Sequence, residues 1–499
     1  MGRRLNVFAT IILLFFAVVA AQAVNIQFFR AGALNASPQN PRVSQASVTA
    51  QRGEIVAADG TILARSVPVG ANGNVYRRIY PLGSLTAGLV GFFSPSYGTW
   101  ALEAEYNSYL IAHAQPPQTL VQLLAPTTAT DNVTLTLQPS LQRVAQRYLA
   151  GRDGAAVVLD PRTGAILAMY SNPTYNPVPF TSFNYQTVSA AWKKDTKNNA
   201  HGFPPLGLVA TQQTFPPGST FKIVTTSAVV VSKPQLLNKV YPAMTTISLP
   251  NSNKTLSNYA FGNCGGTIAY MLPPSCDTGF ALVGLDLGGT ALADAANSFG
   301  INEVPPIDLP GVVASYFPPG ASFTYNQPQL AYSAIGQENV RLSALQNALV
   351  AAAVGNGGVM MTPHLMDYIS GTDGTVVKRY SPSVWKKPLT PAQAAQIVPL
   401  MVNVAKYGTA AGWFPAADDV GAKTGTSQVG NAAQNTDDWM IAFAPAGHPT
   451  IAVAVVVPFQ VTSATGASVA GPIMRCLVEG ALALQAGHPA SGTPTTCAG

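Results

Sequence analysis

The stretch from Phe215 to Lys222, which reads Phe-Pro-Pro-Gly-Ser-Thr-Phe-Lys, decides the fold of this chain. Two prolines and a glycine interrupt regular structure, whereas the apolar run of residues 223–231 that follows is typical of a buried helix. Ser219 is therefore expected in the first turn of that helix, whose N-terminus favours negative charge. Because a spacing of three places two side chains on one helix face, the Lys222 amine can reach the Ser219 hydroxyl and act as its base.

The spacing of a serine and a lysine is not specific by itself, because such pairs also arise by chance. Ser383 and Lys386 form a second pair of this kind, without the proline-glycine entry that precedes Ser219. The assignment of a nucleophile therefore depends on what the rest of the sequence contains.

A second motif, Lys423-Thr424-Gly425, occurs once in the chain and is followed by Thr426. On a strand, Lys423 and Gly425 point to one face, and glycine lets a ligand approach the backbone closely. A basic residue and hydroxyls beside a nucleophile can hold a substrate carboxylate in position. In isolation, an ordinary turn is the default interpretation of such a triplet.

Length and composition place the protein among large folded proteins. The chain has 499 residues, of which 47% are hydrophobic and 10% charged, so it can bury a large core and form more than one domain. Lysine and arginine are scattered and the net charge is only +6, which does not indicate nucleic-acid binding. The sequence contains neither a zinc-type cluster of Cys and His nor a Walker-type phosphate loop.

Chemistries that need a histidine or paired carboxylates fit less well. The five histidines lie in loop-like surroundings and the chain has no Gly-x-Ser-x-Gly elbow, so a Ser-His-Asp hydrolase is not indicated. The Asp437-Asp438 pair is interpreted as a solvated turn rather than an acid-base dyad, because no partner motif indicates glycoside chemistry.

The N-terminus carries an export signal. Arg3 and Arg4 precede an apolar run from about residue 7 to 24, which is about long enough to cross a bilayer once. The two arginines predict a cytoplasmic N-terminus, with the body of the protein outside the membrane. A cleaved signal peptide is the alternative, since Ala21-Gln22-Ala23 resembles a cleavage site, but the run is longer than a typical signal core.

The cysteine content suits an exported protein with up to two disulfides, formed among Cys264, Cys276, Cys476 and Cys497. Cys264 with Cys276 is the favoured bond, because it closes a short loop rich in glycine and proline. Four cysteines allow several pairings, and spacing alone does not exclude the others.

The pattern of the chain changes at Ala155. Before it, short strand-like pieces and turn signals such as Asp59-Gly60 predict an elongated, mostly β region, with a helix near residues 141–149. After it, a hairpin, a helix-rich middle, further strands and a closing helix are expected, at residues 155–159, 165–170, 290–299, 342–354, 390–406, 420–426, 439–444, 451–457 and 468–485. This order predicts one antiparallel sheet assembled from both ends of a domain around an all-helical insert.

Ser-x-x-Lys followed by Lys-Thr-Gly is the order found in serine penicillin-recognising enzymes, so the chain resembles the class B penicillin-binding proteins, particularly the short actinobacterial type. The likeness covers nearly the whole chain and includes Arg52-Gly53, Asp59-Gly60, residues 160–171, 334–337 and 356–358, and the segment from Asp438 to Pro445. It implies an α+β penicillin-binding, β-lactamase-like transpeptidase domain, with an antiparallel sheet and a helical subdomain. The implied order is a membrane anchor (1–30), a mostly β pedestal (31–150), the transpeptidase domain (151–486) and a flexible tail (487–499).

The resemblance also implies a reaction. Lys222 takes the proton of Ser219, which attacks the penultimate D-Ala of a peptidoglycan stem peptide, and Ser275 shuttles the proton to the departing amine. The backbone amides of Ser219 and Thr426 form the oxyanion hole. Lys423, Thr424, Gly425 and Thr426 bind the substrate carboxylate. An amine from a second stem peptide resolves the acyl-enzyme, a β-lactam leaves Ser219 acylated, and no cofactor is needed.

Partners and location follow from the same resemblance. The substrates are stem peptides, lipid-linked or on nascent glycan, and the catalytic domain lies outside a membrane crossed once. A glycan polymerase and septal or elongation proteins are further expected partners, through the membrane helix and the pedestal.

The second family motif departs from the pattern. Ser-x-Asn is expected, but the equivalent segment is Ser275-Cys276-Asp277. An ionised Asp277 only accepts hydrogen bonds and favours a charged Lys222, which makes that amine a poorer base. Either Asp277 is protonated or turned away and catalysis survives, or the protein is a slow enzyme or a scaffold. A D,D-carboxypeptidase and a β-lactamase also remain alternatives.

Overall fold

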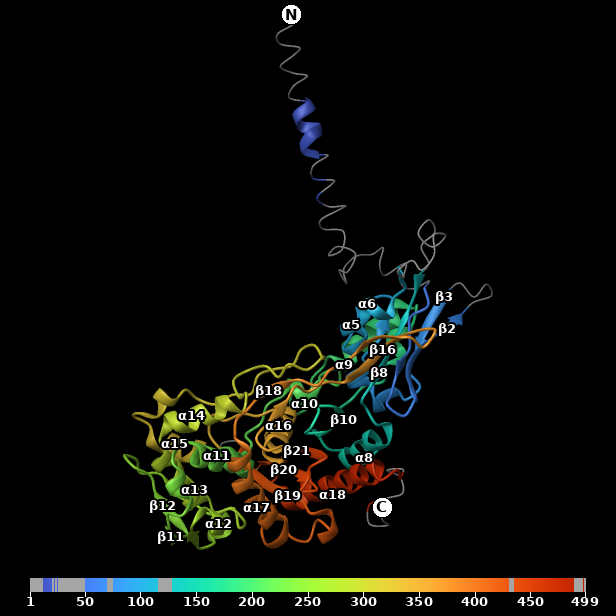
Figure 1. Ribbon diagram of the computed structural model, residues 1–499. Coiled ribbons are helices and arrows are strands. Elements are labelled where there is room, and N and C mark those ends of the chain that lie inside the picture. Colours follow the sequence, from blue (N-terminus) through green and yellow to red (C-terminus); the bar gives the residue numbers. More distant parts are fainter. Residues whose placement is uncertain are drawn as a thin grey trace, which may run out of the picture.

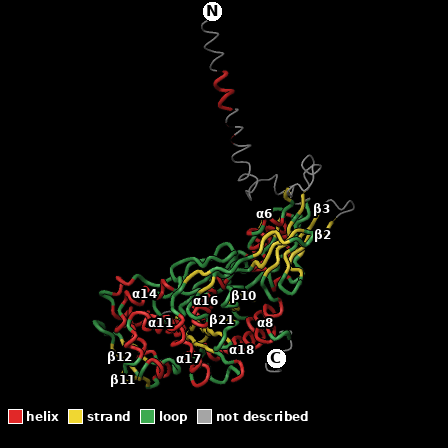
Figure 2. The backbone as a smooth tube through the Cα atoms, viewed as in Figure 1, coloured by secondary structure: helices red, strands yellow, loops and turns green. Residues whose placement is uncertain are grey.

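The computed structural model describes residues 12–19, 22, 25, 50–69, 75–114, 128–429, 435–488 and 497 (Figure 1). Most of the expected anchor (1–30) and most of the expected tail (487–499) lie outside these residues. The described chain forms a β-rich pedestal joined to a larger lobe in which helices surround a sheet (Figure 2). The expected α+β architecture is therefore confirmed.

The pedestal is built on a six-stranded sheet whose order is β17-β16-β8-β1-β2-β3. β1 and β2 form an antiparallel pair around the predicted Asp59-Gly60 turn. β16 comes from far along the chain and pairs antiparallel with β8, so the pedestal is not a continuous segment. The strands are Ile55–Val56 (β1), Ile62–Val69 (β2), Val75–Ile79 (β3), Asp131–Leu135 (β8), Met366–Gly371 (β16) and Val376–Arg379 (β17).

Short elements complete the pedestal. They are η2 (Gly83–Leu85), α4 (Ala87–Val90), β4 (Phe93–Ser94), β5 (Gly98–Thr99), α5 (Leu102–Glu105), α6 (Asn107–Leu110), β6 (His113–Ala114) and β7 (Thr128–Ala129). β4 pairs with β5, and β6 pairs with β7. These small pairs and single helical turns fit the predicted mostly β region.

A buried ionic cluster holds the pedestal together. The Glu103 carboxylate in α5 lies 2.8 Å from Arg52 Nη2 and 2.5 Å from Arg78 Nε, and all three side chains are buried. The Tyr80 hydroxyl donates to the same carboxylate at 3.2 Å. Burial raises the pKa of Glu103, but the charges of Arg78 and Arg52 outweigh burial and leave the pKa below its ordinary value. The cluster links residues far apart in the sequence.

Replacing Glu103 by glutamine is expected to destabilise the protein by about 3–5 kcal/mol, because two buried arginines lose their counter-charge. Urea unfolding followed by circular dichroism measures the change. The exposed Glu105 of the same helix provides the control, since Glu105→Gln is expected to change stability by less than about 0.5 kcal/mol. Equal effects of the two substitutions would exclude a structural role for the cluster.

The larger lobe contains the predicted antiparallel sheet, with the order β10-β9-β21-β20-β19. The expected hairpin forms one side of the sheet, and the three expected C-terminal strands form the other side, where β21 pairs with β9. Its strands are Gly154–Leu159 (β9), Ile166–Asn172 (β10), Gly421–Val429 (β19), Asn435–Ala444 (β20) and Ile451–Val461 (β21). Helix α16 (Ala344–Gly355) packs on one face, and α18 (Gly466–Gln485) with α8 (Pro139–Leu149) covers the other (Figure 1).

Among the described residues, α18 is the one helix with the length and apolar character of a membrane span, with a mean hydropathy of 1.4. It packs against β20, β21 and α8 and is more than half buried. These contacts identify α18 as a core helix of the larger lobe.

The insert between β10 and β19 carries the predicted helices at 290–299, 342–354 and 390–406, which form α14 (Gly289–Ser298), α16 and α17 (Pro391–Tyr407). The prediction that the insert is all helical is wrong, because it also contains paired short strands. These strands are Tyr241–Met244 (β11), Thr246–Ser248 (β12), Thr255–Ser257 (β13), Cys264–Gly266 (β14), Met360–Met361 (β15) and Val384–Lys386 (β18). Their partners lie up to about two dozen residues away, with little alternation to reveal them.

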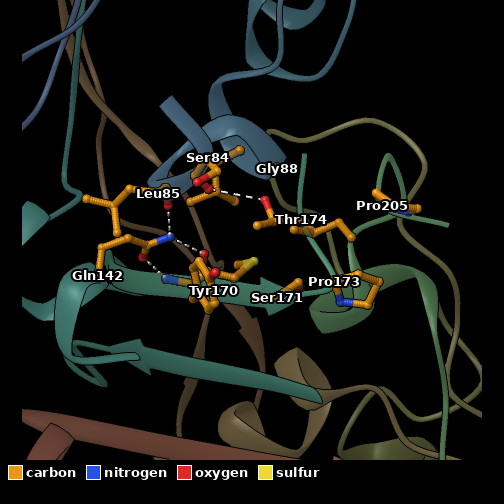
Figure 3. Close-up of a pocket in the computed structure, with 13 residues that line it drawn as sticks. Ser84, Leu85, Gly88, Gln142, Tyr170, Ser171, Pro173, Thr174 and Pro205 are labelled. Atoms are coloured by element: carbon orange, nitrogen blue, oxygen red, sulfur yellow. Dashed lines mark hydrogen bonds between the residues drawn. The ribbon is translucent and has the colours of Figure 1, made fainter. Parts of the chain in front are cut away.

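The pedestal and the larger lobe meet around Gln142 of α8 (Figure 3). Its amide donates to the carbonyls of Leu85, at 3.2 Å, and Met169, at 2.8 Å, and it accepts from Met169 N at 3.0 Å. Thr174 Oγ1 also donates to Ser84 O at 3.1 Å. The remaining cavity of about 10 Å³ holds at most about one water molecule, so the joint is closely packed.

Candidate active site

Ser219 lies in η4 (Gly218–Phe221), a short 3₁₀ turn that leads directly into α11 (Lys222–Ser232). The predicted position at a helix entry is therefore confirmed, although the first turn is 3₁₀ rather than α. Hydrogen bonds to two other segments fix this turn, because Gly218 N donates to Gly336 O at 2.9 Å and Asn347 Nδ2 donates to Thr220 Oγ1 at 3.0 Å. Ser219 itself remains half-buried, and thus accessible to a substrate.

The Lys222 side chain is fully buried, and its amine has three acceptors. Nζ donates to Ser275 O at 2.7 Å, to Ser275 Oγ at 3.2 Å and to Asp277 Oδ1 at 2.7 Å. Three acceptors match the three protons of an ammonium group. Within the described residues, none of these hydrogen bonds goes to Ser219. This arrangement fits the protonated form of Lys222, which must lose a proton before it can act as a base.

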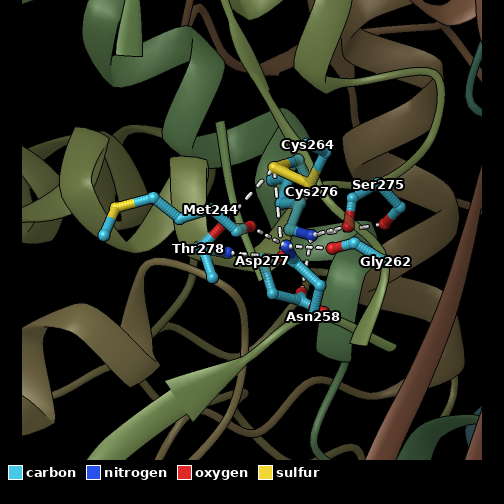
Figure 4. The surroundings of a disulfide bond; sticks show 9 residues. Met244, Asn258, Gly262, Cys264, Ser275, Cys276, Asp277 and Thr278 are labelled. Atoms are coloured by element: carbon cyan, nitrogen blue, oxygen red, sulfur yellow. Dashed lines mark hydrogen bonds and ion pairs between the residues drawn. A yellow bond between two sulfur atoms is a disulfide. The ribbon is translucent and has the colours of Figure 1, made fainter. Parts of the chain in front are cut away.

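Asp277 owes its position to the start of α13 (Asp277–Leu287), where it occupies the first turn. A carboxylate there is stabilised by the helix N-terminus. The preceding residue is fixed by a disulfide between Cys264 and Cys276, the pair that the loop length favoured, and the following residue by Asn258 Oδ1, which accepts from Thr278 N at 2.8 Å (Figure 4). Cys476 and Cys497 form a second disulfide, remote in sequence from the site.

Lys423 enters the site from β19, the edge strand of the sheet. It is fully buried, and its Nζ donates to Ser275 Oγ at 2.8 Å and to Thr424 O at 2.9 Å. Gly425 lets the strand lie directly against η4, because an added Cβ would stand 2.6 Å from Pro217 O. The structure thus brings Ser219, Lys222, Ser275, Asp277 and Lys423 together from three separate segments.

The two lysines share the Ser275 hydroxyl but differ in their surroundings. Burial lowers the pKa of Lys222, and Asp277 opposes this effect through its charge and its hydrogen bond. Burial also lowers the pKa of Lys423, and the nearby charge of Lys222 lowers it further, well below its ordinary value. Of the two amines, Lys423 is therefore the one that loses its proton first.

The interpretation of Asp437-Asp438 as a solvated turn is wrong. Both residues lie within β20 and are buried, with exposed fractions of 2% and 0%, and Asp438 stands opposite Thr426. Burial raises the pKa of Asp437 to about 6 and that of Asp438 to about 7. A pair of aspartates usually indicates a loop, and only the sheet register places these two inside.

The carboxylate of Asp438 gives stability a pH dependence. Its folded pKa of about 7 exceeds the ordinary 3.8, so the folded protein keeps a proton that the unfolded chain releases. Stability must therefore fall as the pH rises from about 4 to about 7, by up to about 4 kcal/mol, and stay low above. Asp438→Asn removes this loss, so its melting temperature is expected to exceed that of the wild type at pH 8, with a smaller difference at pH 5.

Differential scanning fluorimetry at the two pH values measures this effect. Asp367→Asn is the matched control, because Asp367 is a half-exposed carboxylate on the pedestal strand β16. A difference between Asp438→Asn and the wild type that is the same at pH 5 and pH 8 would contradict the assignment.

The other Ser-x-x-Lys pair lies away from this site. Lys386 Nζ is paired with Glu303 Oε1 at 2.6 Å, and Ser383 Oγ donates to Thr362 Oγ1 at 2.9 Å. Two residues that the sequence did not single out do lie at the site, Asn258 behind the second motif and Thr409 beside Thr424. Neither stands in a recognisable motif, and both reach the site only through contacts between distant segments.

Comparisons with known proteins agree over both lobes. The family described as penicillin binding protein transpeptidase domain matches residues 154–479, and the penicillin binding protein A dimerisation domain matches residues 52–132. The peptidoglycan D,D-transpeptidase PbpA of Mycobacterium tuberculosis is 33% identical over 481 residues, covering 92% of this chain and 95% of the relative. The protein of the same description from Mycolicibacterium smegmatis is 33% identical over 97% of this chain and 99% of the relative.

Solved structures give the same result. Penicillin-binding protein A from Mycobacterium tuberculosis, as a penicillin G acyl-enzyme complex, is similar with a TM-score of 0.77 and 32% identity, covering 87% of this chain and all of that chain. Its imipenem acyl-enzyme complex matches with the same TM-score, identity and coverage.

Proposed function

Because this chain belongs to the class B penicillin-binding protein transpeptidases, we propose that it cross-links peptidoglycan stem peptides through an acyl-enzyme on Ser219. The observation that carries the proposal is that Lys222, which directly follows the Ser219 turn, and Lys423 both donate to the Ser275 hydroxyl. The relatives with solved acyl-enzyme complexes support covalent inhibition by β-lactams. Intact-mass analysis of the wild type and of Ser219→Ala after incubation with penicillin tests the proposal.

Acylation requires the Ser219 hydroxyl to lose its proton. Lys222 follows in the same helical segment and accepts this proton once it has passed one of its own to the Ser275 hydroxyl, which passes its proton to Lys423. The relay conserves charge, because the net change moves one proton from Ser219 to Lys423. Burial and the nearby charge of Lys222 lower the pKa of Lys423, which favours the neutral amine that this step requires.

The attack on the penultimate D-Ala carbonyl creates a negatively charged oxygen. The backbone amides of Ser219 and Thr426 stabilise it, and loss of one such donor typically costs about 10²–10³ in rate. Edge strand β19 supports this role, since alternate backbone groups of an edge strand have no partner in the sheet. The departing D-Ala amine then takes a proton from Ser275, and Ser275 regains one from Lys423, which returns that amine to its starting state.

The substrate carboxylate is held by Lys423, Thr424, Gly425 and Thr426. Thr426 Oγ1 accepts a hydrogen bond from Gly466 N at 2.9 Å, which helps to orient this hydroxyl. An amine of a second stem peptide then attacks the ester, restores Ser219 and completes the cross-link. A β-lactam imitates the D-Ala-D-Ala terminus and leaves Ser219 acylated.

Three alternatives are separated by simple measurements. A D,D-carboxypeptidase releases D-Ala from two stem peptides without forming a dimer. A β-lactamase hydrolyses its penicilloyl adduct within seconds. A scaffold forms no adduct at Ser219, and this alternative is favoured by one specific contact, the ion pair with Asp277, which favours the charged form of Lys222.

The protein is anchored in the membrane by its N-terminal segment, with the catalytic lobe outside. Residues 12–19 are helical and expose large apolar side chains, namely Ile12, Leu13, Leu14, Phe15, Phe16, Val18 and Val19. Arg3 and Arg4 keep the N-terminus cytoplasmic. A glycan polymerase and septal or elongation proteins are the partners proposed for the anchor and the pedestal.

A further inference from the structure

Thr409 joins two parts of the site that the sequence keeps far apart. Its Oγ1 lies 2.5 Å from Oγ1 of Thr424, the central residue of the Lys-Thr-Gly motif. Its backbone N–H donates to Pro273 O at 3.0 Å, two residues before Ser275. One residue therefore contacts both the substrate-binding strand and the loop that carries the shared serine.

The position of Thr409 is set by the end of α17. Gly408 N donates to Val404 O at 3.1 Å, and Ala410 N donates to the same carbonyl at 3.3 Å. Gly408 has no Cβ, and one built there would collide with Pro273 O, so only glycine permits this approach. Ala410 is fully buried. The hydroxyl is thus presented by a rigid helix end, and Thr409 is half-exposed beside the buried Thr424.

When two hydroxyls are in contact, the proton of one forms the hydrogen bond between them, and the proton of the other remains available to a further acceptor. When Thr424 donates to Thr409, Thr424 has no proton left for a ligand. When Thr409 donates to Thr424, the Thr424 proton is free, and the first hydrogen bond polarises the second. A carboxylate beside Thr424 favours the second arrangement, because hydrogen bonds to charged acceptors are stronger than those between neutral groups.

We propose that Thr409 is a positioning residue, whose hydroxyl donates to Thr424 and so turns the Thr424 proton toward the carboxylate of a D-Ala-D-Ala terminus or a β-lactam. The proposal rests on the proposed function, since it assumes that Thr424 binds that carboxylate. This positioning role makes Thr409 a determinant of selectivity for ligands that end in a carboxylate.

The test compares Thr409→Val, which keeps the shape but removes the hydroxyl, with Thr409→Ser, which keeps the hydroxyl. Acylation of Ser219 is followed by stopped-flow fluorescence and intact mass, using benzylpenicillin and its methyl ester, which lacks the charge. Thr409→Val is expected to lower the second-order rate constant for benzylpenicillin about 10-fold or more, the scale of one hydrogen bond to a charged group, and to leave the ester rate unchanged. Thr409→Ser is expected to restore the wild-type ratio.

Equal losses with the acid and the ester would overturn the proposal, because they would indicate a purely structural role. Unchanged rates with both ligands would overturn it as well. Thr424→Val provides a reference, since it should reproduce the selectivity of Thr409→Val, and the two effects should not add. Failure of the proposed function is distinct, because wild-type protein would then form no adduct at Ser219 with benzylpenicillin.

Discussion

Ser219→Ala is expected to abolish the covalent adduct with penicillin and to lower cross-linking by at least about 10³-fold. The hydroxyl that forms the ester lies at the entry to α11, and alanine offers no nucleophile. Intact-mass spectrometry after incubation with benzylpenicillin measures the adduct as a gain of one penicillin mass. Because Ser219 is half-buried and its side chain makes no hydrogen bond among the described residues, the variant should keep its melting temperature.

Ser383→Ala is the matched control, since Ser383 belongs to the other Ser-x-x-Lys pair of the chain. That variant should form the adduct at the wild-type rate. An adduct that persists in Ser219→Ala, or wild-type protein that forms none, would rule out the proposed nucleophile. A cross-linking assay with two stem peptides then separates transpeptidation from release of D-Ala alone.

Asp277→Asn is expected to raise the acylation rate at pH 7 by about 10-fold or more. The Asp277 carboxylate raises the pKa of Lys222 against the effect of burial, and an opposite charge at this distance shifts a pKa by about 1–3. Without the carboxylate, that pKa falls and Lys222 loses its extra proton at a lower pH. A base-catalysed rate rises through the pKa of its base, so the pH profile of acylation should shift to lower pH. Stopped-flow acylation between pH 5 and 10 measures this shift.

The control for Asp277→Asn is Asp286→Asn, near the end of the same helix α13. Asp286 binds Lys239 and Tyr241 and does not contact the site, so its variant should keep the wild-type pH profile. An Asp277→Asn rate that does not increase, with an unchanged profile, would show that the carboxylate does not impair acylation. An increase would show that the carboxylate slows acylation in an enzyme that is nevertheless active, without any need for a scaffold role.

The elements that could be predicted from the sequence are those with local signals. The 155–159 and 165–170 hairpin, the three C-terminal strands and helix 468–485 all appear close to the expected bounds, because an apolar run between turn residues identifies a strand or helix. Strands β16 and β17 were not expected in the pedestal. Asp373-Gly374 marks the turn of a hairpin, but nothing local names its partner, and only the pairing of β16 with β8 makes the two strands part of that sheet.

The features of the candidate site also fall into two groups, those visible in the sequence and those that only the fold reveals. The Ser219 and Lys222 spacing, the Lys-Thr-Gly triplet and the Ser275-Cys276-Asp277 departure are visible in the chain, because each lies within a few residues. The burial of Asp437 and Asp438 and the Thr409 contact are not visible, since each depends on the register of β20 against β19 or on where α17 ends. A sequence without its fold does not record which distant residues face one another.

The sequence by itself determined that Ser219 begins a buried helix and that Lys222 lies on the same face, because helix geometry is set by neighbours in the chain. Only the tertiary structure decided which acceptors surround the Lys222 amine. They come from residues 275–277, more than fifty positions away, and they favour the charged form of the Lys222 amine. Charge depends on burial and on distances through space, and chain folding alone sets both.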